Sequence, residues 1–327
     1  VIPKPPCLPA RTGSLMYSIL LPIIRGRLLN QCAVYKTNQI IGSWTAVLCK
    51  GLFRKKLVVR CGYLYSLFNR YKNNKVKYWF GTFIEALAFR CADRVVVSAE
   101  YDKRHVQKKY AKKVEFIPNY VDTSRFAPNK SAHRKDILFV GRLDHQKNVM
   151  NLIKAIAKTS YRLDIYGDGE LEIQAKKRIH DLHLKDRITI QGPVRHALLP
   201  EIYNAYELFV LPSFYEGMPK VLLEAMSCGV CCLGTDVPGI KEVIEHGTNG
   251  MLVDTGEEAL RRGAAFLMEN DSLRREYGLR ARETILKRYS YTHALQKERT
   301  VLHEVMAGAR SCATGSSSSS AFQANPG

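Results

Sequence analysis

From residue 136 onward, short runs rich in β-branched and aromatic residues alternate with stretches whose apolar residues recur at helical spacing. Parallel strands must be joined by crossover helices, so this alternation predicts a parallel sheet built from right-handed βαβ units. The expected strands are Ile137–Val140, Arg162–Tyr166, Ile188–Gln191, Leu208–Leu211, Val230–Leu233 and Met251–Val253. The expected helices are Val149–Ala157, Glu170–Leu182, Leu198–Ala205, Lys220–Ser227, Lys241–Ile244 and Glu257–Met268. The pattern predicts a nearly complete Rossmann-like domain.

The front half of the chain gives weaker signals of the same kind. Lys56–Arg60 and Arg94–Ser98 are expected to be strands, and Thr82–Cys91 and Tyr101–Ala111 to be helices. A chain of 327 residues suits two domains of roughly 150 residues each. The expected fold class is therefore α/β, with two Rossmann-like domains that contain parallel sheets, the first of them incomplete.

The boundaries of these domains are predicted from composition. The polar, proline-containing stretch Ala127–Lys135 is expected to be the linker, and Leu279–Ala307 to form two helical pieces that separate near Tyr289–Tyr291. Ser316–Ser320 is of low complexity, which is typical of disorder. The predicted parts are a front domain over 1–130, a second domain over 131–290, a helix over 291–309 that crosses back to the front domain, and a disordered tail over 310–327.

Positive charge is concentrated in the front half. Residues 1–130 contain 24 Lys and Arg against 6 Asp and Glu, whereas the remainder contains 26 against 24. A field of one sign favours an anionic partner, either acidic lipid headgroups, a phosphorylated acceptor or nucleic acid. No recognition motif accompanies the charge, so nucleic acid is not expected. The densest basic cluster is either a solvated face or a surface that docks on an anionic membrane; it consists of Lys103, Arg104, Lys108, Lys109, Lys112 and Lys113.

The location of the protein is predicted from its cysteines and its first apolar run. The nine cysteines include no CxxC pair and have no zinc-site spacing, which favours a reducing, cytoplasmic setting. Within the cytoplasm, peripheral attachment to the inner face of the membrane is a further possibility that this prediction includes. The run Leu15–Ile24 is far shorter than the ~20 residues that span a bilayer. A signal peptide is one interpretation, and a buried or membrane-surface segment is the preferred one. Because the chain begins with Val1, its natural N-terminus is expected to be missing.

The most informative motif follows the strand expected at Leu208–Leu211. A loop leads to Pro219, which is expected at the first position of the next helix. The amides of Gly217, Met218 and Lys220 would then point out of a helix N-terminus, an arrangement that suits a diphosphate.

Two glutamates lie in and beside this helix, Glu216 before it and Glu224 inside it. Since Glu224 is surrounded by apolar neighbours, burying it would require a hydrogen-bonding partner, which vicinal ribose hydroxyls would supply. The alternative is that Glu224 faces solvent and Glu216 only caps the helix. The residues alone leave both interpretations open.

The segment from Pro212 to Met226 resembles the E-x7-E signature of glycosyltransferase family 4, a family with the GT-B fold. Further pieces of the family pattern follow the same order along the chain, and such ordered agreement is far more specific than one glycine motif. They are Ile117–Asp122 with Phe126, Gly141–Leu143 with Lys147 and Asn148, Tyr166–Gly169, Gly192, Tyr203, Gly229, Gly239, Glu242 and Asn249–Gly250. The resemblance covers about residues 82 to 309.

This resemblance implies a retaining hexosyltransferase that takes its sugar from a nucleoside-diphosphate donor bound to the second domain, while the basic front domain holds a glycan or lipid-linked acceptor. Glu216 would hydrogen-bond the transferred sugar, Glu224 the ribose, and Arg142 with Lys147 would neutralise the leaving diphosphate. Neither a metal nor another cofactor is implied. The residues expected to act in catalysis or donor binding are Glu216, Arg142, Lys147, Gly141, Gly167, Gly217, Met218, Pro219 and Glu224.

Several departures from the family pattern keep other functions open. The front domain lacks the usual glycine-rich loop, Val58–Tyr63 contains no histidine, and Tyr120 stands where glycine is usual. For Gly167 and Gly169 a plain turn is as good an interpretation as donor contact. The alternatives for the whole chain are a GT-B sugar-nucleotide epimerase or phosphorylase, or an inactive module that binds sugar nucleotides or serves as a membrane adaptor.

Overall fold

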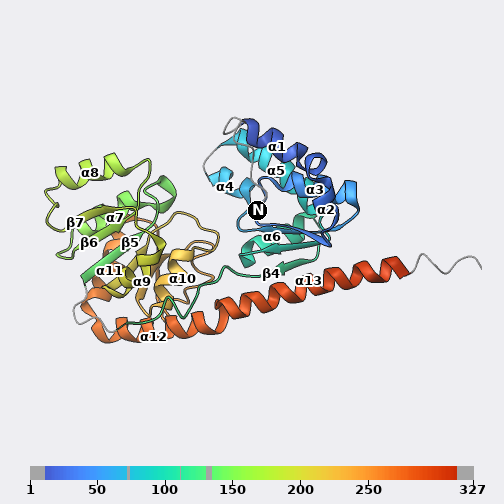
Figure 1. Cartoon of the computed structure of the whole chain (residues 1–327). Coiled ribbons are helices and arrows are strands. Elements are labelled where there is room, and N and C mark those ends of the chain that lie inside the picture. The colour runs from blue at the N-terminus through green and yellow to red at the C-terminus, as the bar shows by residue number, and fades with distance from the viewer. Residues whose placement is uncertain (1–11, 72–73, 111, 130–134, 315–327) are drawn as a thin grey trace, which may run out of the picture. The chain divides into compact units, whose positions relative to one another are not determined.

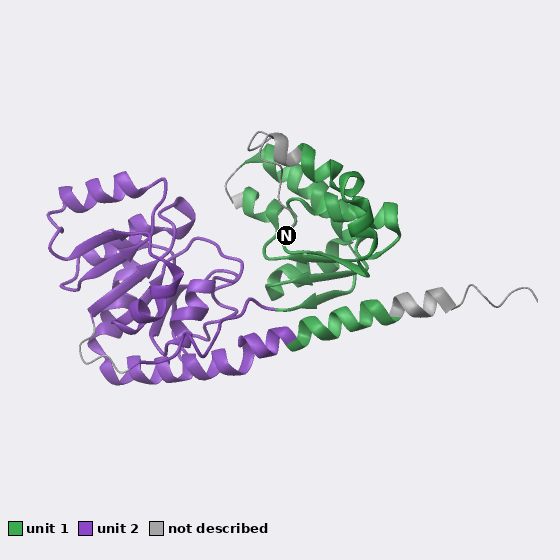
Figure 2. Ribbon diagram, in the orientation of Figure 1, with its two compact units in different colours: residues 1–117, 296–327 green, residues 118–295 purple. Residues whose placement is uncertain are grey.

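The computed structural model describes residues 12–71, 74–110, 112–129 and 135–314. Internal contacts divide the chain into two compact units, each an α/β unit with one parallel sheet (Figure 2). Unit 1 takes residues 1–117 and 296–327, and unit 2 takes residues 118–295. The α/β class expected from the sequence is confirmed in both units.

Unit 1 contains a sheet of four parallel strands whose spatial order, β1-β2-β3-β4, is also their order along the chain (Figure 1). Alternate buried residues of β2 and β3, such as Leu57, Val59 and Val95, pack against the helices of the unit. The strands are β1 (Val34–Thr37), β2 (Lys56–Cys61), β3 (Arg94–Val97) and β4 (Val114–Phe116). The helices are α1 (Thr12–Ile24), α2 (Gly26–Asn30), α3 (Ser43–Phe53), α4 (Tyr65–Tyr71), α5 (Lys75–Cys91) and α6 (Glu100–Tyr110).

Unit 2 contains a sheet of six parallel strands in the order β10-β9-β8-β5-β6-β7. The chain adds β6 and β7 on one side of β5, and then returns to place β8, β9 and β10 on the other side. The order therefore reverses between β5 and β8, which pair directly through Ile137 and Leu208. The strands are β5 (Lys135–Val140), β6 (Leu163–Tyr166), β7 (Ile188–Gly192), β8 (Tyr206–Leu211), β9 (Cys231–Thr235) and β10 (Met251–Val253).

The helices predicted between residues 149 and 268 are present, with one exception, whereas η1 and the first residues of α12 were not predicted. Lys241–Val243 lies in turns and Ile244 in irregular structure, so the helix predicted at Lys241–Ile244 was wrong. The turns include Gly239, whose backbone is left-handed, and they lead to a loop that the Asn249 side chain holds through Glu245 N and Val243 O. The helices are η1 (His145–Lys147), α7 (Val149–Ala157), α8 (Glu172–Asp181), η2 (His196–Leu198), α9 (Leu199–Asn204), α10 (Lys220–Ser227), α11 (Glu257–Glu269) and α12 (Asp271–Arg288).

The division between the units falls earlier than the predicted boundary at residue 130. Residues 118–129 belong to unit 2, because Val121 pairs with Ser290 and the Arg282 guanidinium donates to the carbonyls of Thr123 and Phe126. Hydrogen bonding, which composition does not reveal, sets this boundary. Part of the predicted linker, residues 130–134, lies outside the described residues.

The last helix, α13 (Tyr291–Thr314), follows a break at Tyr289 and Ser290. From Gln296 onward it is assigned to unit 1, where Glu298 pairs with Lys36 of β1 and Arg60 of β2. Because the helix continues to Thr314, the first residues of the predicted tail are helical, and the remainder, 315–327, lies outside the described residues.

Candidate functional site

The reversal of strand order in unit 2 places two loops at one edge of its sheet. The loop after β5 carries Arg142 and Lys147, and the loop after β8 carries Ser213 and Glu216. Ligands of open α/β sheets bind outside the carboxyl ends of the strands where the strand order reverses. Residues distant in the sequence are thus brought together where a ligand is expected.

Gly141 and Gly167 fix the first loop by a direct backbone contact. Gly167 has a φ of 147°, and a Cβ there would lie 1.9 Å from the carbonyl oxygen of Gly141. A Cβ on Gly141 would itself meet the Phe139 ring at 3.2 Å and the Lys147 side chain at 3.7 Å. Gly167 therefore permits close approach of two chain segments. Donor contact by either glycine stays a prediction.

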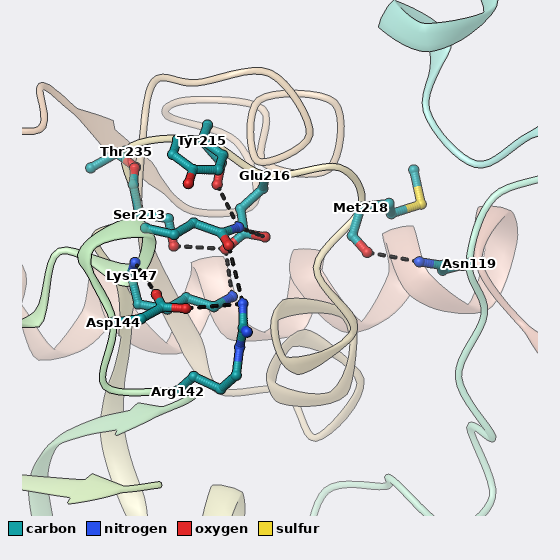
Figure 3. A network of polar contacts seen from close by, with 10 residues as sticks. Asn119, Arg142, Asp144, Lys147, Ser213, Tyr215, Glu216, Met218 and Thr235 are labelled. Atoms are coloured by element: carbon teal, nitrogen blue, oxygen red, sulfur yellow. Dashed lines mark hydrogen bonds and ion pairs between the residues drawn. The ribbon is translucent and has the colours of Figure 1, made fainter. Parts of the chain in front are cut away.

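Gly239 has the equivalent position beneath the second loop. Its φ is 86°, and a Cβ there would lie 1.7 Å from the carbonyl oxygen of Gly217. The backbone around Gly217 and Met218 therefore rests directly on the turn at Gly239. Asn119 holds the same loop from another side, because its Nδ2 donates to the carbonyl oxygen of Met218 at 2.8 Å (Figure 3).

Side chains of η1 and α7 connect the two loops to each other. Asn148, which has a left-handed φ of 55°, donates from Nδ2 to the carbonyl oxygens of Pro212 at 2.9 Å and of Thr255 at 2.8 Å. Gln146 Nε2 donates to the carbonyl oxygen of Tyr215 at 3.0 Å. The edge of the site is thus held by side chains that bind main-chain carbonyls.

Lys147 and Glu216 form an ion pair at the centre of this network (Figure 3). Lys147 Nζ lies 2.6 Å from Glu216 Oε1, and the side chains are only 12% and 7% exposed. Ser213 Oγ also donates to Glu216 Oε1 at 2.7 Å, and Thr235 Oγ1 holds the Ser213 carbonyl oxygen at 2.5 Å. Lys147 was predicted to contact the leaving diphosphate and Glu216 to contact the transferred sugar. In this structure the two side chains pair with each other.

Arg142 lies beside this pair but is far more exposed. Its NH2 group is 3.0 Å from Asp144 Oδ2 and 3.3 Å from Gln146 Oε1. Asp144 is buried and also accepts a hydrogen bond from the Lys147 amide at 3.1 Å, so it caps η1 and orients Arg142. The two predicted cations therefore converge on one loop, with Lys147 held and Arg142 open to solvent.

Helix α10 has the predicted bounds, but Pro219 does not take the first helical position that was expected for it. Pro219 occupies the N-cap position, with extended backbone, and Lys220 is the first helical residue. The helix has no side-chain cap, so its start offers main-chain amides and the positive end of the helix dipole to this edge. Gly217, Met218 and Pro219 lead directly into this start, and diphosphate binding there stays a prediction.

Glu224, one turn into α10, is 5% exposed, so the solvent-facing interpretation was wrong. Its carboxylate has partners within the chain: Tyr203 Oη donates to Oε2 at 3.1 Å, and His196 Nε2 lies 3.0 Å from Oε1. Burial and the neighbouring carboxylate raise the pKa of Tyr203 well above its ordinary value, so the hydroxyl remains a donor. Neither partner was predicted from the sequence, although Tyr203 is part of the family pattern.

In unit 1, two β2 residues of the stretch Val58–Tyr63, which contains no histidine, have structural surroundings. Arg60 pairs with Glu298 of α13 and Cys61 is fully buried. Within the described ranges, no three His, Cys, Asp or Glu side chains are grouped as ligands of a metal ion.

The reversed sheet, the uncapped helix start, the two cations and the buried glutamate thus lie together in an α/β unit of the GT-B type. The family model for "Glycosyl transferases group 1" matches residues 121–284, and the chain belongs to this family. The match covers nearly all of unit 2 and every predicted site residue.

Two relatives and one solved structure illustrate the similarity. The chain is 30% identical over 54% of its length to N-acetyl-alpha-D-glucosaminyl L-malate synthase of Bacillus anthracis, covering 47% of that protein. It is 32% identical over 53% of its length to UDP-Gal:alpha-D-GlcNAc-diphosphoundecaprenol alpha-1,3-galactosyltransferase of Escherichia coli, covering 50% of it. These matches thus span about half the length of each relative. The structure of Anabaena HepE in complex with UDP and glucose superposes with a TM-score of 0.77 at 19% identity, over 90% of this chain and 83% of that one, which shows the shared fold.

Proposed function

We propose that the protein is a retaining glycosyltransferase. It moves a hexose from a nucleoside-diphosphate sugar to a glycan or lipid-linked acceptor in the synthesis of a cell-surface polysaccharide or lipopolysaccharide. The observation that carries this proposal is the Lys147–Glu216 pair, set beside the uncapped start of α10 within the family-matched unit. The names of two similar proteins, which mention UDP-galactose, a diphosphoundecaprenol acceptor, UDP and glucose, support the substrate classes.

In the proposed reaction, the bond between sugar C1 and the diphosphate oxygen breaks and its electron pair stays on the diphosphate. The acceptor hydroxyl oxygen forms the new bond to C1 on the same face, and its proton passes to the departing diphosphate. Negative charge grows on the leaving oxygen as the bond lengthens. Arg142, Lys147 and the amides at the start of α10 would stabilise that charge more in the transition state than in the ground state.

The ion pair gives Lys147 and Glu216 a shared role in this proposal. A diphosphate that arrives beside Lys147 competes with the Glu216 carboxylate for the ammonium group. When Lys147 shifts to the phosphate, Glu216 gains free lone pairs for a hydroxyl of the transferred sugar, while Ser213 keeps the carboxylate in place. The pair would therefore hold both side chains ready in the free enzyme, and the reaction would proceed without a metal.

Glu224 supplies the proposed ribose contact. Tyr203 and His196 occupy one position on each carboxylate oxygen, and a carboxylate offers about four acceptor positions in total. The remaining positions can accept hydrogen bonds from vicinal ribose hydroxyls. Tyr203 and His196 would then set the direction in which the carboxylate faces.

The test combines donor binding with turnover. Thermal unfolding is measured with UDP, GDP, ADP and their common sugar conjugates, because a ligand selective for the folded state stabilises it by mass action. One base should raise the melting temperature, Glu224→Ala should abolish that rise, and the exposed Glu201→Ala should preserve it. Release of the nucleoside diphosphate should then depend on an acceptor and should survive EDTA.

Three outcomes would contradict the proposal. Turnover without any sugar acceptor would identify an epimerase, and turnover that requires free phosphate would identify a phosphorylase. Donor binding without transfer or hydrolysis, across lipid-linked and glycan acceptors, would identify an inactive binding module.

A membrane as the location of the acceptor is also part of the proposal. It is supported by the charge of residues 1–130, which contain 24 Lys and Arg against 6 Asp and Glu. None of the helices in the described ranges combines the length and apolarity needed to cross a bilayer.

A further inference from the structure

Helix α1 exposes an apolar stripe. Its exposed side chains recur at intervals of three and four residues, which places them on one face of the helix. The opposite face packs on α3: Trp44 Nε1 donates to Ser18 Oγ at 2.9 Å, and Thr45 Oγ1 donates to the Ser18 carbonyl oxygen at 2.7 Å. The exposed stripe consists of Met16, Ile19, Leu20, Ile23 and Ile24, of which Ile23 is 76% exposed.

Helix α5 also exposes an apolar stripe, although its opposite face is already in the core. Ile84, Ala88 and Phe89 are buried against the sheet of unit 1. The outer face carries Val76, Trp79, Phe80, Phe83 and Leu87, with Trp79 69% and Phe83 66% exposed. A water-soluble helix normally presents polar residues on its outer face, so large aromatic side chains there indicate a binding surface.

Both helices contact α3 and are drawn at the same end of unit 1 in Figure 1. Basic side chains accompany the two stripes. Arg25 and Arg27 follow the end of α1, Lys75 and Lys77 lie in the first turn of α5, and Arg90 lies in its last turn; all five are exposed.

Acidic side chains are almost absent from this part of the chain. Residues 1–99 contain only two, Glu85 and Asp93. Glu85 is buried and bonded to Ser66, and Asp93 is paired with Lys50 at 2.5 Å. No unpaired carboxylate in the described part of residues 1–99 would therefore repel an anionic surface.

We infer that the exposed stripes of α1 and α5 form a docking surface for an anionic lipid bilayer. An in-plane helix of this kind buries its apolar face at the headgroup boundary, while aromatic rings occupy the interface and flanking Lys and Arg bind acidic headgroups. The inference deepens the membrane part of the proposed function and rests on it. It requires no turnover, so vesicle binding and sugar transfer can fail separately.

The basic cluster of α6 fits this role less well than its sequence indicated. Lys103 pairs with Glu100, Lys112 donates to the Ala92 carbonyl oxygen, and Lys113 pairs with Glu115 and Glu304. Helix α6 also ends at Tyr110, so the six cations do not share one helical face. The apolar stripes supply what a purely basic face lacks, namely side chains that enter the lipid.

The test is flotation of the full chain with vesicles of phosphatidylcholine alone or with phosphatidylglycerol. Binding is expected to the mixed vesicles and to fall about tenfold or more in each of Trp79→Ser/Phe83→Ser and Ile19→Ser/Ile23→Ser. Ile173→Ser is the matched control, because Ile173 is an equally exposed apolar residue of α8 in unit 2. Arg104→Gln/Lys108→Gln tests the α6 cluster and should bind as the wild type.

A spectroscopic readout locates the contact. The chain contains only two tryptophans, Trp44 and Trp79, so Trp44→Phe leaves Trp79 as the sole indole. Its emission should shift to shorter wavelength with mixed vesicles and be quenched by brominated lipid. Donor-induced thermal stabilisation should be unchanged in every stripe variant, which shows that the fold is intact.

The inference is overturned if the stripe variants bind mixed vesicles like the wild type, or if only the α6 variant loses binding. It is also overturned if light scattering shows a dimer that Trp79→Ser/Phe83→Ser converts to a monomer, because the stripes would then be covered by a second copy. Failure of wild-type binding to mixed vesicles would remove the membrane proposal and leave the transfer proposal standing.

Discussion

The two units use the same kind of parallel sheet but connect its strands differently. In unit 2 the strand order reverses between β5 and β8, whereas the described strands of unit 1 follow one another in chain order. A reversal separates the loops that follow two neighbouring strands and leaves a crevice at the sheet edge. The proposed donor would bind at this edge of unit 2.

The surfaces of the two units differ as well. Unit 2 holds its site loops with Asn148, Gln146 and backbone contacts at Gly239. Unit 1 instead leaves large apolar side chains such as Trp79 in solvent. The comparison indicates that unit 2 is organised for a precisely positioned small molecule, and unit 1 for a broad surface. Each prediction below tests one side of that contrast.

The largest effect is expected from Gly239→Ala. The new Cβ would lie 1.7 Å from the Gly217 carbonyl oxygen, so the loop before α10 must move, at a cost of about 4 kcal/mol or more. Gly247→Ala is the matched control, because Gly247 has a φ of 78° with no atom within 4 Å of the Cβ; its backbone strain alone costs about 1 kcal/mol.

Urea unfolding measures this prediction in each unit. Both tryptophans are in unit 1, so their emission reports unit 1, while far-ultraviolet circular dichroism reports both units. Gly239→Ala should lower the dichroism midpoint and leave the fluorescence midpoint unchanged. If both midpoints fall together, the units unfold as one and the contrast fails.

The second effect concerns the central ion pair. Lys147→Met should reduce transfer about 100-fold or more, because a cation aimed at developing charge is removed. Glu298→Gln, which loosens the contacts of α13 with Lys36 and Arg60 in unit 1, should leave donor-induced thermal stabilisation unchanged. The measurement for Lys147→Met is the initial rate of transfer at saturating donor. A wild-type rate for this variant would remove the proposed diphosphate contact.

The third effect is smaller. Tyr203→Phe removes one hydrogen bond to the Glu224 carboxylate, worth about 1.5 kcal/mol, and should weaken nucleoside-diphosphate affinity about tenfold. Calorimetric titration measures it. The exposed Tyr101→Phe of unit 1 serves as the control and should bind the nucleotide normally. Unchanged affinity for Tyr203→Phe would show that Glu224 needs no support from this hydroxyl.

The smallest effect is a pH dependence in unit 1. Burial raises the pKa of Glu85 above its ordinary value, and hydrogen bonds from Ser66 only partly offset this. The folded state therefore favours the protonated form of Glu85. The free energy of unfolding that this preference contributes is complete below the unfolded pKa of 4.5 and is lost as pH rises through the raised pKa of the folded state. Glu85→Gln should flatten the decline in stability over that range, as measured by tryptophan emission in urea. A wild-type slope in the variant would exclude Glu85 as its source.

Much of unit 2 could be predicted because each segment carries its own periodic signal. Val149–Ala157, Lys220–Ser227 and Met251–Val253 have the predicted bounds, since their apolar residues follow one clear period. The order of motifs also predicted a glycosyltransferase, and the match to the model for group 1 glycosyltransferases confirms that prediction. In unit 1, β1, β4 and the helices α1 to α4 were not predicted, because short and strongly apolar segments leave helix and strand unresolved.

Contacts between distant residues could not be predicted. Nothing near Glu216 in the sequence indicates that Lys147 would neutralise it, and nothing near Glu224 indicates His196. The same limit applies to α5, where an amphipathic period identifies the buried face but says nothing about whether an aromatic outer face meets water or lipid. Those relations depend on the reversal of strand order and on the packing of each unit.

The hydrogen bonds of Asn148 also determine how this region can change during evolution. Its amide binds the main-chain oxygens of residues 212 and 255, and every amino acid supplies a main-chain oxygen. Side chains at those two positions can therefore drift without severing the connection. A substitution at 148 breaks both bonds at once, so selection is expected to be strict at one position and permissive at the two that it joins.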